Sequence, residues 1–298
     1  MWLNRINSFT HLAAVVLLGG ALAAPVSAQR PDTMLPEDSA AKAKQILQEL
    51  IHALGGPGYT QVRESQCQGQ RAQFGHNGEP LGYVAFTEDR QYPDKLRVEY
   101  SAKSHNLKSI LNTVIGVDGL DLSHGGVIVA VYNGDHGWAL DRGGVSDLPA
   151  DAMADFQEQV KRNIGNLLRF RLNENGMTIR YGGNDTADRR EVEWVELTDS
   201  EDRTFRLAVE RSTHLLIRSV VITENQETHE RDEDVSIYTK YQLKDSVWTP
   251  LTVTREHNDR MATQFFYDTC KYDPGFPSDL FDKSSLQKRG GDGAAKKK

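Results

Sequence analysis

The sequence predicts an α+β fold dominated by one large, curled, antiparallel β-sheet. Three segments, 204–210, 235–243 and 261–269, alternate apolar and polar side chains, as half-buried strands do. Polar turns at intervals of roughly 8–12 residues separate these and neighbouring segments between 181 and 270, which is typical of a meander of consecutive strands. A curled sheet of this kind can hold a ligand on its concave face.

The first 28 residues have the features of a secretory signal peptide. Arg5 supplies a positive charge, residues 12–22 form a short apolar run, and Val26-Ser27-Ala28 fits the cleavage rule. The apolar run is shorter than the roughly 20 residues that a membrane-spanning helix needs. We therefore expect export, to the periplasm if the source is a Gram-negative bacterium, and a flexible segment over 29–37. An uncleaved membrane anchor is the alternative.

Composition and charge limit the class of partner. The chain has 298 residues and a formal net charge of −7, which argues against a nucleic-acid partner. The stretch 38–284 contains no linker and is predicted to form one domain. The basic, glycine-rich stretch 285–298 is predicted to be a disordered tail, although peripheral contact with an anionic membrane surface is an alternative.

Two amphipathic helices are predicted to cover the sheet. The first begins at a cap, Asp38 or Ser39, carries an apolar stripe from Ile46 to Leu54, and ends at the glycine-rich stretch 55–58. The second spans 149–172, with apolar residues recurring every three or four positions. Further strands are expected over 60–70, 81–88 and 95–100, and in a hairpin over 126–139 that turns at Asn133-Gly134.

The stretch 101–126 interrupts the strand pattern. Ile110, Leu111 and Val114, with their apolar neighbours, are spaced as one face of a short helix would be, and glycines follow. A long apolar excursion between strands is often functional, so this segment is a candidate lid over the cavity. The alternative is a helix packed against the sheet as ordinary core.

Both cysteines, Cys67 and Cys270, lie in the exported part, in the first and last predicted strands. In an oxidising compartment they can form one disulfide that fastens the two ends of the sheet together. The alternative is two separate buried thiols.

Large apolar residues on the predicted strands are candidates for the wall of a ligand cavity. In a curled sheet such side chains either fill the core or line a cavity, and both readings remain open. The candidates are Trp138, Trp194, Phe205, Leu207, Ile237 and Phe265.

Catalytic signatures are incomplete. His124-Gly125-Gly126 is similar to the oxyanion-hole loop of some esterases, but the sequence contains no GxSxG nucleophile motif. His229-Glu230 begins like a zinc-protease motif, but Glu233 stands where the second histidine is required. The sequence therefore predicts no catalytic residues, no metal site and no cofactor.

Three segments resemble the LolA/LolB lipoprotein-carrier superfamily, and most closely its outer-membrane lipoprotein-sorting-like proteins. They are the hairpin Tyr132–Trp138, the stretch Glu210–Arg218 and the hairpin Tyr241–Pro250. The resemblance implies a half-barrel of about eleven antiparallel strands, closed on one side by helices around a hydrophobic cavity for acyl chains. Ser246 departs from the glycine usual in the family, and no equivalent of the carriers' functional arginine can be assigned.

These observations together predict a periplasmic, non-catalytic carrier or binding protein. Its partner would be a lipid or an acylated protein, held in an apolar cavity. The alternative is an envelope sensor or scaffold that uses the same fold to bind a protein partner.

Overall fold

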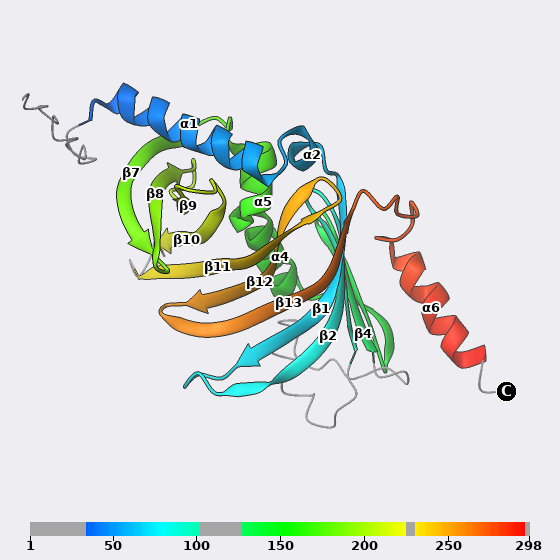
Figure 1. Cartoon of the computed structure of the whole chain (residues 1–298). Coiled ribbons are helices and arrows are strands. Elements are labelled where there is room, and N and C mark those ends of the chain that lie inside the picture. Colours follow the sequence, from blue (N-terminus) through cyan, green and yellow to red (C-terminus); the bar gives the residue numbers. More distant parts are fainter. Residues whose placement is uncertain (1–33, 102–126, 225–229, 296–298) are drawn as a thin grey trace, which may run out of the picture.

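The computed structural model describes residues 34–101, 127–224 and 230–295, and within these ranges all strands belong to one open antiparallel sheet (Figure 1). The predicted fold class, an α+β protein with a large curled sheet, is confirmed. The described residues form thirteen strands, whereas the family resemblance implied about eleven. The strands are β1 (Glu64–Phe74), β2 (Pro80–Gln91), β3 (Lys95–Ser101), β4 (Val127–Asn133), β5 (His136–Asp141), β6 (Gly144–Asp147), β7 (Thr178–Ala187), β8 (Arg190–Thr198), β9 (Thr204–Glu210), β10 (Leu216–Glu224), β11 (Arg231–Lys244), β12 (Val247–His257) and β13 (Arg260–Tyr272).

The first and last strands of the chain lie side by side in the middle of the sheet. β1 pairs with β13, β2 to β6 extend the sheet on one side, and β12 back to β7 extend it on the other. The two edge strands, β6 and β7, are therefore consecutive in the sequence. The segment that joins them contains α4 (Ala150–Arg162), α5 (Ile164–Asn166) and the π-helix η2 (Leu167–Arg171), and it crosses inside the curl of the sheet (Figure 1).

Helix α1 (Pro36–Leu54) begins earlier than the sequence predicts. Leu35 is the N-cap and Pro36 occupies the first turn, where a missing N–H has no helical partner to lose. The prediction that Asp38 or Ser39 caps this helix is wrong, and the predicted flexible segment 29–37 extends too far. The Ser39 Oγ instead accepts a hydrogen bond from the Tyr181 backbone N–H at 3.0 Å, which ties the helix to β7.

Gly55 ends α1 where the chain passes close to the β11–β12 turn. Its φ is +131°, and a Cβ there would lie 2.2 Å from the Ser246 carbonyl oxygen. A residue with a side chain would therefore be strained and would also clash. The short α2 (Pro57–Thr60) follows directly.

The concave face carries two separate hydrophobic cores. In one, α1, α2 and η2 pack on β7 to β9, where Leu50, Phe205 and Leu207 are fully buried. In the other, α4 packs on β2 to β5 and β13, and the Phe156 ring stacks on Tyr132 with the ring centroids 4.4 Å apart. The side chains of the two cores do not fill the space between them.

The helix predicted over 149–172 is not continuous. Asn163 adopts an extended backbone conformation, with φ −69° and ψ 118°, so α4 ends at Arg162. The Asn163 side chain accepts a hydrogen bond from the Asn166 N–H at 2.9 Å and thereby caps the next turn. This break directs Phe156 into one core and Leu167 into the other.

Residues 285–295 do not form the disordered tail that the sequence predicts. They belong to α6 (Lys283–Ala295), which packs on β5 and β6, and Leu286 is fully buried among Val129, Val131 and Phe281. These side chains alternate along β4 with those of the concave core, so α6 covers the opposite face of the sheet. The glycine-rich, basic composition of this stretch predicts disorder and gives no indication that Leu286 is buried.

We predict that Leu286→Ala lowers the free energy of unfolding by about 2–4 kcal/mol, because it opens a cavity under a docked helix. Urea denaturation of the variant measures this loss. Gln287→Ala, on the exposed side of α6, is the matched control and should change stability by less than about 0.5 kcal/mol. Equal stability of both variants would show that α6 is not docked in solution.

Candidate functional site

A cavity of about 610 Å³ lies between the two concave cores. Its floor is the concave face of β1, β2 and β10 to β13, and its roof is the α4–α5–η2 segment around the break at Asn163. The apolar part of its wall comes from both cores, and includes Leu54, Leu96, Phe156, Val160, Leu168, Leu216, Val221 and Val253. The break in the helix and the gap between the cores therefore create the cavity together.

The cavity is not the apolar one that the sequence predicts. Ionised and hydroxyl-bearing side chains make up much of its wall, and they lie on the same face of the strands as the core residues. On β2, for example, Val84 and Phe86 belong to a core, and Glu88 and Arg90 continue the same face into the cavity. A lining of both kinds suits an amphipathic ligand better than a purely apolar one.

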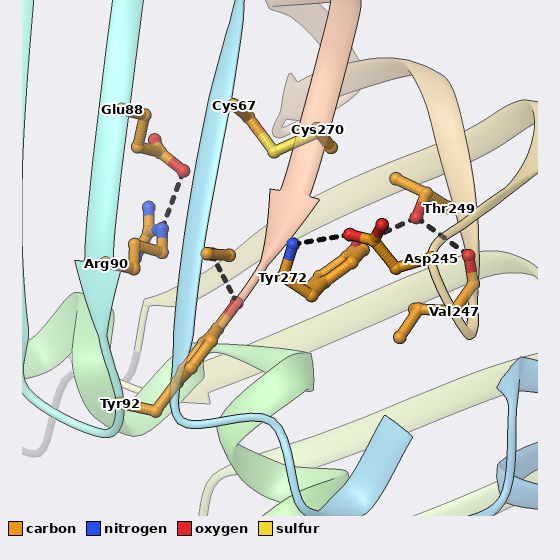
Figure 2. Close-up of a disulfide and its surroundings, with 10 residues drawn as sticks. Cys67, Glu88, Arg90, Tyr92, Asp245, Val247, Thr249, Cys270 and Tyr272 are labelled. Carbon is orange, nitrogen blue, oxygen red and sulfur yellow. Dashed lines mark hydrogen bonds and ion pairs between the residues drawn. A yellow bond between two sulfur atoms is a disulfide. The ribbon is translucent and has the colours of Figure 1, made fainter. Parts of the chain in front are cut away.

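Glu88 and Arg90 form an ion pair within this wall (Figure 2). The Arg90 Nε donates a hydrogen bond to the Glu88 Oε1 at 2.6 Å. The Glu88 side chain is 15% exposed and the Arg90 side chain is 25% exposed. Burial alone would raise the pKa of Glu88, but the charge and hydrogen bond of Arg90, followed by the charges of Arg255 and Arg71, lower it. Glu88 is therefore held in its ionised form.

Arg71 and Arg255 flank the ring of Phe265 beside this pair. Their guanidinium carbons lie 5.2 Å and 4.9 Å from the ring centroid. Arg71 also donates to the Tyr100 hydroxyl at 3.2 Å. Stacking on an aromatic face stabilises a guanidinium that has been partly removed from water. Three arginines thus surround one carboxylate on this part of the wall.

Tyrosine hydroxyls form another part of the polar wall. Tyr92 contacts the Ser65 hydroxyl at 3.2 Å, Tyr272 contacts the Thr249 hydroxyl at 2.7 Å (Figure 2), and Tyr238 contacts the Ser219 hydroxyl at 2.9 Å. Burial raises the pKa of Tyr238 and of Tyr272, so both hydroxyls stay protonated. These groups can donate hydrogen bonds but are poorly suited to exchange protons near neutral pH.

The two cysteines form a disulfide that lines the cavity next to Glu88 (Figure 2). Cys67 of β1 and Cys270 of β13 are direct cross-strand partners, with their α-carbons 4.2 Å apart. The predicted pairing is therefore present. The prediction that the bond fastens the two ends of the sheet is wrong, because the first and last strands meet in its centre.

The aromatic and aliphatic candidates from the sequence do not form the cavity wall. Phe205 and Leu207 are fully buried in the core under α1, and Phe265 lies in the other core, beneath Arg71 and Arg255. Trp138 packs towards α6, on the opposite face of the sheet. The lid candidates Ile110, Leu111 and Val114 lie outside the described residues.

Trp194 and Ile237 also face away from the cavity. They belong to a smaller apolar cluster, with Val192 and Ala208, on the other face of β8 to β11. The Arg206 guanidinium covers the Trp194 ring at 4.8 Å and pairs with Glu196 at 3.1 Å. On this face the charged Arg206 side chain covers part of the cluster.

The charged wall residues were missed at the sequence level, although a signal was present. Strand periodicity extends the buried face of β2 from Val84 and Phe86 to Glu88 and Arg90. Two charges of opposite sign on the apolar face of a strand indicate a buried polar site. The sequence prediction ended the strand at Glu88 and did not use this signal.

Within the described ranges, no cluster of three or more histidine, cysteine, aspartate or glutamate side chains could hold a metal ion. Over the same ranges, none of the helices combines the length and the hydropathy that a membrane crossing requires.

Comparisons with known proteins identify the fold. No protein-family model and no curated protein matches the sequence. Among solved structures, the chain is similar to a DUF1329 family protein from Desulfovibrio piger, with a TM-score of 0.52 and 12% identity over 82% of this chain and 99% of that one.

Two further solved structures are similar over most of the chain. One is a domain assigned to outer membrane lipoprotein sorting from Vibrio parahaemolyticus, with a TM-score of 0.49 and 10% identity over 83% of this chain and 99% of that one. The other is a LolA superfamily protein from Nitrosomonas europaea, with a TM-score of 0.49 and 11% identity over 82% of this chain and 99% of that one. The likeness in all three cases is one of fold alone.

We predict that the unfolded, unreduced protein contains essentially no free thiol, because Cys67 and Cys270 are bonded. Reduction should lower the free energy of unfolding by about 5 kcal/mol in the chain-entropy model, since 203 residues separate the cysteines. Thiol titration and urea denaturation, with and without reductant, measure both effects. Two reactive thiols in the unreduced sample would contradict the pairing.

We also predict that Glu88→Gln lowers stability at pH 7 by about 3–5 kcal/mol, because it leaves the Arg90 charge without its partner. The folded pKa of Glu88 lies below its ordinary value of 4.5, so the stabilisation is present above pH 4.5 and is lost as pH falls through the folded pKa. The variant should lack this part of the acid dependence in urea denaturation. Glu191→Gln, which removes an exposed partner of Arg211, should behave like the wild type.

Proposed function

We propose that this protein is an exported, non-catalytic binding protein that holds a lipid, or the acyl chain of an acylated protein, in the cavity on its concave face. The observation that carries this proposal is the cavity of about 610 Å³ with an apolar and a charged part in one wall. Pockets for small ligands in proteins typically enclose about 300–1,000 Å³. The sequence resemblance to the lipoprotein-carrier superfamily supports the same class of ligand.

The chemistry of the wall supports binding rather than catalysis. Glu88 is held ionised and the nearby tyrosines are held protonated, so neither group is suited to transfer a proton near neutral pH. His257 pairs with Asp234 at 2.8 Å at the edge of the cavity. Its other ring nitrogen lies 3.3 Å from the Asn258 amide rather than beside a hydroxyl nucleophile.

Two observations support a location outside the cytoplasm. A disulfide between central strands persists in an oxidising compartment, as the periplasm is. The sequence of residues 1–28 has the features of a cleaved signal peptide, and it lies outside the described residues. Periplasmic localisation agrees with both.

An envelope sensor or scaffold that binds a protein partner is the second candidate. Leu243 and Trp248 are directly paired across the β11–β12 hairpin and are 55% and 41% exposed. Trp248 also borders the cavity. An exposed apolar pair at the rim suits contact with a protein that delivers or accepts the cavity's ligand.

We predict that Val160→Trp weakens binding of a fluorescent fatty acid at least tenfold, because the larger side chain projects from α4 into the cavity. Fluorescence titration measures the affinity. Leu81→Trp, the same type of change at an exposed position on β2, is the matched control and should bind normally. Mass spectrometry of lipids that co-purify with the wild type then identifies the natural ligand.

Unchanged affinity in Val160→Trp, with no lipid in the purified wild type, would contradict a cavity ligand. Binding of an envelope protein that is lost on replacing Leu243 and Trp248 by serine would then favour the sensor or scaffold.

A further inference from the structure

The charged part of the cavity wall has an excess of positive charge. Arg90 on β2 and Arg255 on β12 both act on Glu88, so these two guanidinium groups share one carboxylate. Charges that are partly removed from water are expensive unless they are paired. Glu88 therefore balances only one of these two positive charges.

Both of these arginines retain hydrogen-bonding capacity towards the cavity. Arg90 uses only its Nε on Glu88, and its Nη atoms make no hydrogen bond with any described residue. Arg255 stacks on Phe265 and forms neither a hydrogen bond nor an ion pair within the described ranges. An arginine presents its donors in a fixed planar fork, which matches the oxygens of a carboxylate or a phosphate.

A third donor lies beside them. The Tyr267 ring stacks on Phe265 at 6.0 Å, and its hydroxyl makes no hydrogen bond with any described residue. Burial raises the pKa of Tyr267, and Glu88, Arg255 and Arg90 also act on it, so the hydroxyl stays protonated near these three groups. Two guanidinium groups and one phenol are thus available on the same part of the wall.

We infer that the cavity takes an anionic amphiphile, whose carboxylate or phosphate head group is bound by Arg90, Arg255 and Tyr267. The inference rests on the proposed function and specifies its ligand class. The acyl chain would lie against the apolar part of the wall, at Val160, Leu168 and Val221. Glu88 has a positioning role here, because it holds Arg90 by one edge and leaves the other edge to the ligand.

The test compares three amphiphiles with the same chain, laurate, dodecyl phosphate and dodecanol, by calorimetric titration of the full exported chain at pH 7.5. The anionic pair should bind at least tenfold more tightly than dodecanol, because charge-assisted hydrogen bonds form only with an oxyanion. Inorganic phosphate alone should bind at least a hundredfold more weakly than dodecyl phosphate. This comparison separates a lipid head group from a free anion.

Two variants locate the effect. Arg255→Gln and Tyr267→Phe each remove a donor that has no hydrogen-bond partner among the described residues, and the urea transition of each variant checks that it is folded. Each should reduce the preference for laurate over dodecanol by at least threefold. Arg211→Gln makes the same change of charge at an exposed position outside the cavity wall and should keep the wild-type preference.

Each failure has a distinct meaning. Equal affinity for laurate and dodecanol would overturn the head-group inference and leave a neutral-lipid binding protein. Inorganic phosphate that binds as tightly as dodecyl phosphate would overturn the amphiphile in favour of a free anion. Binding of none of the four probes, by a protein shown to be folded by its urea transition, would overturn the proposed function itself.

Discussion

The pairing of β1 with β13 is the constraint on which the rest of the molecule depends. Because the two ends of the meander meet in the centre of the sheet, its edges are β6 and β7, which are neighbours in the sequence. Their connection has to cross the concave face, and it does so as the broken helix α4–α5–η2. The disulfide between Cys67 and Cys270 links β1 to β13 covalently at this central pairing. Strand order therefore places both the roof and the floor of the cavity.

The break at Asn163 is what keeps the interior from closing. A continuous helix would present one apolar stripe to one core, whereas α4 and η2 contribute to two cores separated by a gap. Protein interiors are normally close-packed, so a space of about 610 Å³ means that the residues around it make fewer van der Waals contacts than core residues do. Such a space can remain open where the polar groups around it already have hydrogen-bond or ion-pair partners within the protein. Here the hydrogen bonds between tyrosine and serine or threonine hydroxyls and the Glu88–Arg90 ion pair provide these partners.

The charged side chains of the cavity wall show that apolar burial alone does not describe the interior of this fold. The aromatic face of Phe265 and the charge of Glu88 offset part of the cost of removing Arg71 and Arg255 from water. The wall is electrostatically asymmetric, with Arg90 and Arg255 gathered around Glu88 on the strands and apolar side chains from both helices and strands elsewhere. An interior of this kind discriminates between ligands by head group as well as by chain length.

The sequence by itself determined the class of the fold. Period-two alternation, turn residues and two amphipathic stripes predict a curled antiparallel sheet with helical cover, and the position of the cysteines in the first and last strands predicts their pairing. Each of these features is local or depends on one pair of residues. That is why α1, most of α4 and strands β9, β11 and β13 lie where the pattern predicts them.

Only the tertiary structure decided which face of each strand is the interior. Alternation separates Trp194 and Ile237 from their neighbours, but it does not say which set faces the helices, and both lie on the opposite face. Strand periodicity places Glu88 and Arg90 on the apolar face of β2, but only the curl of the sheet shows that this part of the face lines a cavity. The fold of residues 285–295 was decided by the docking of Leu286, a long-range contact that composition does not encode. Burial depends on contacts between distant segments, and these are fixed by strand order rather than by local sequence.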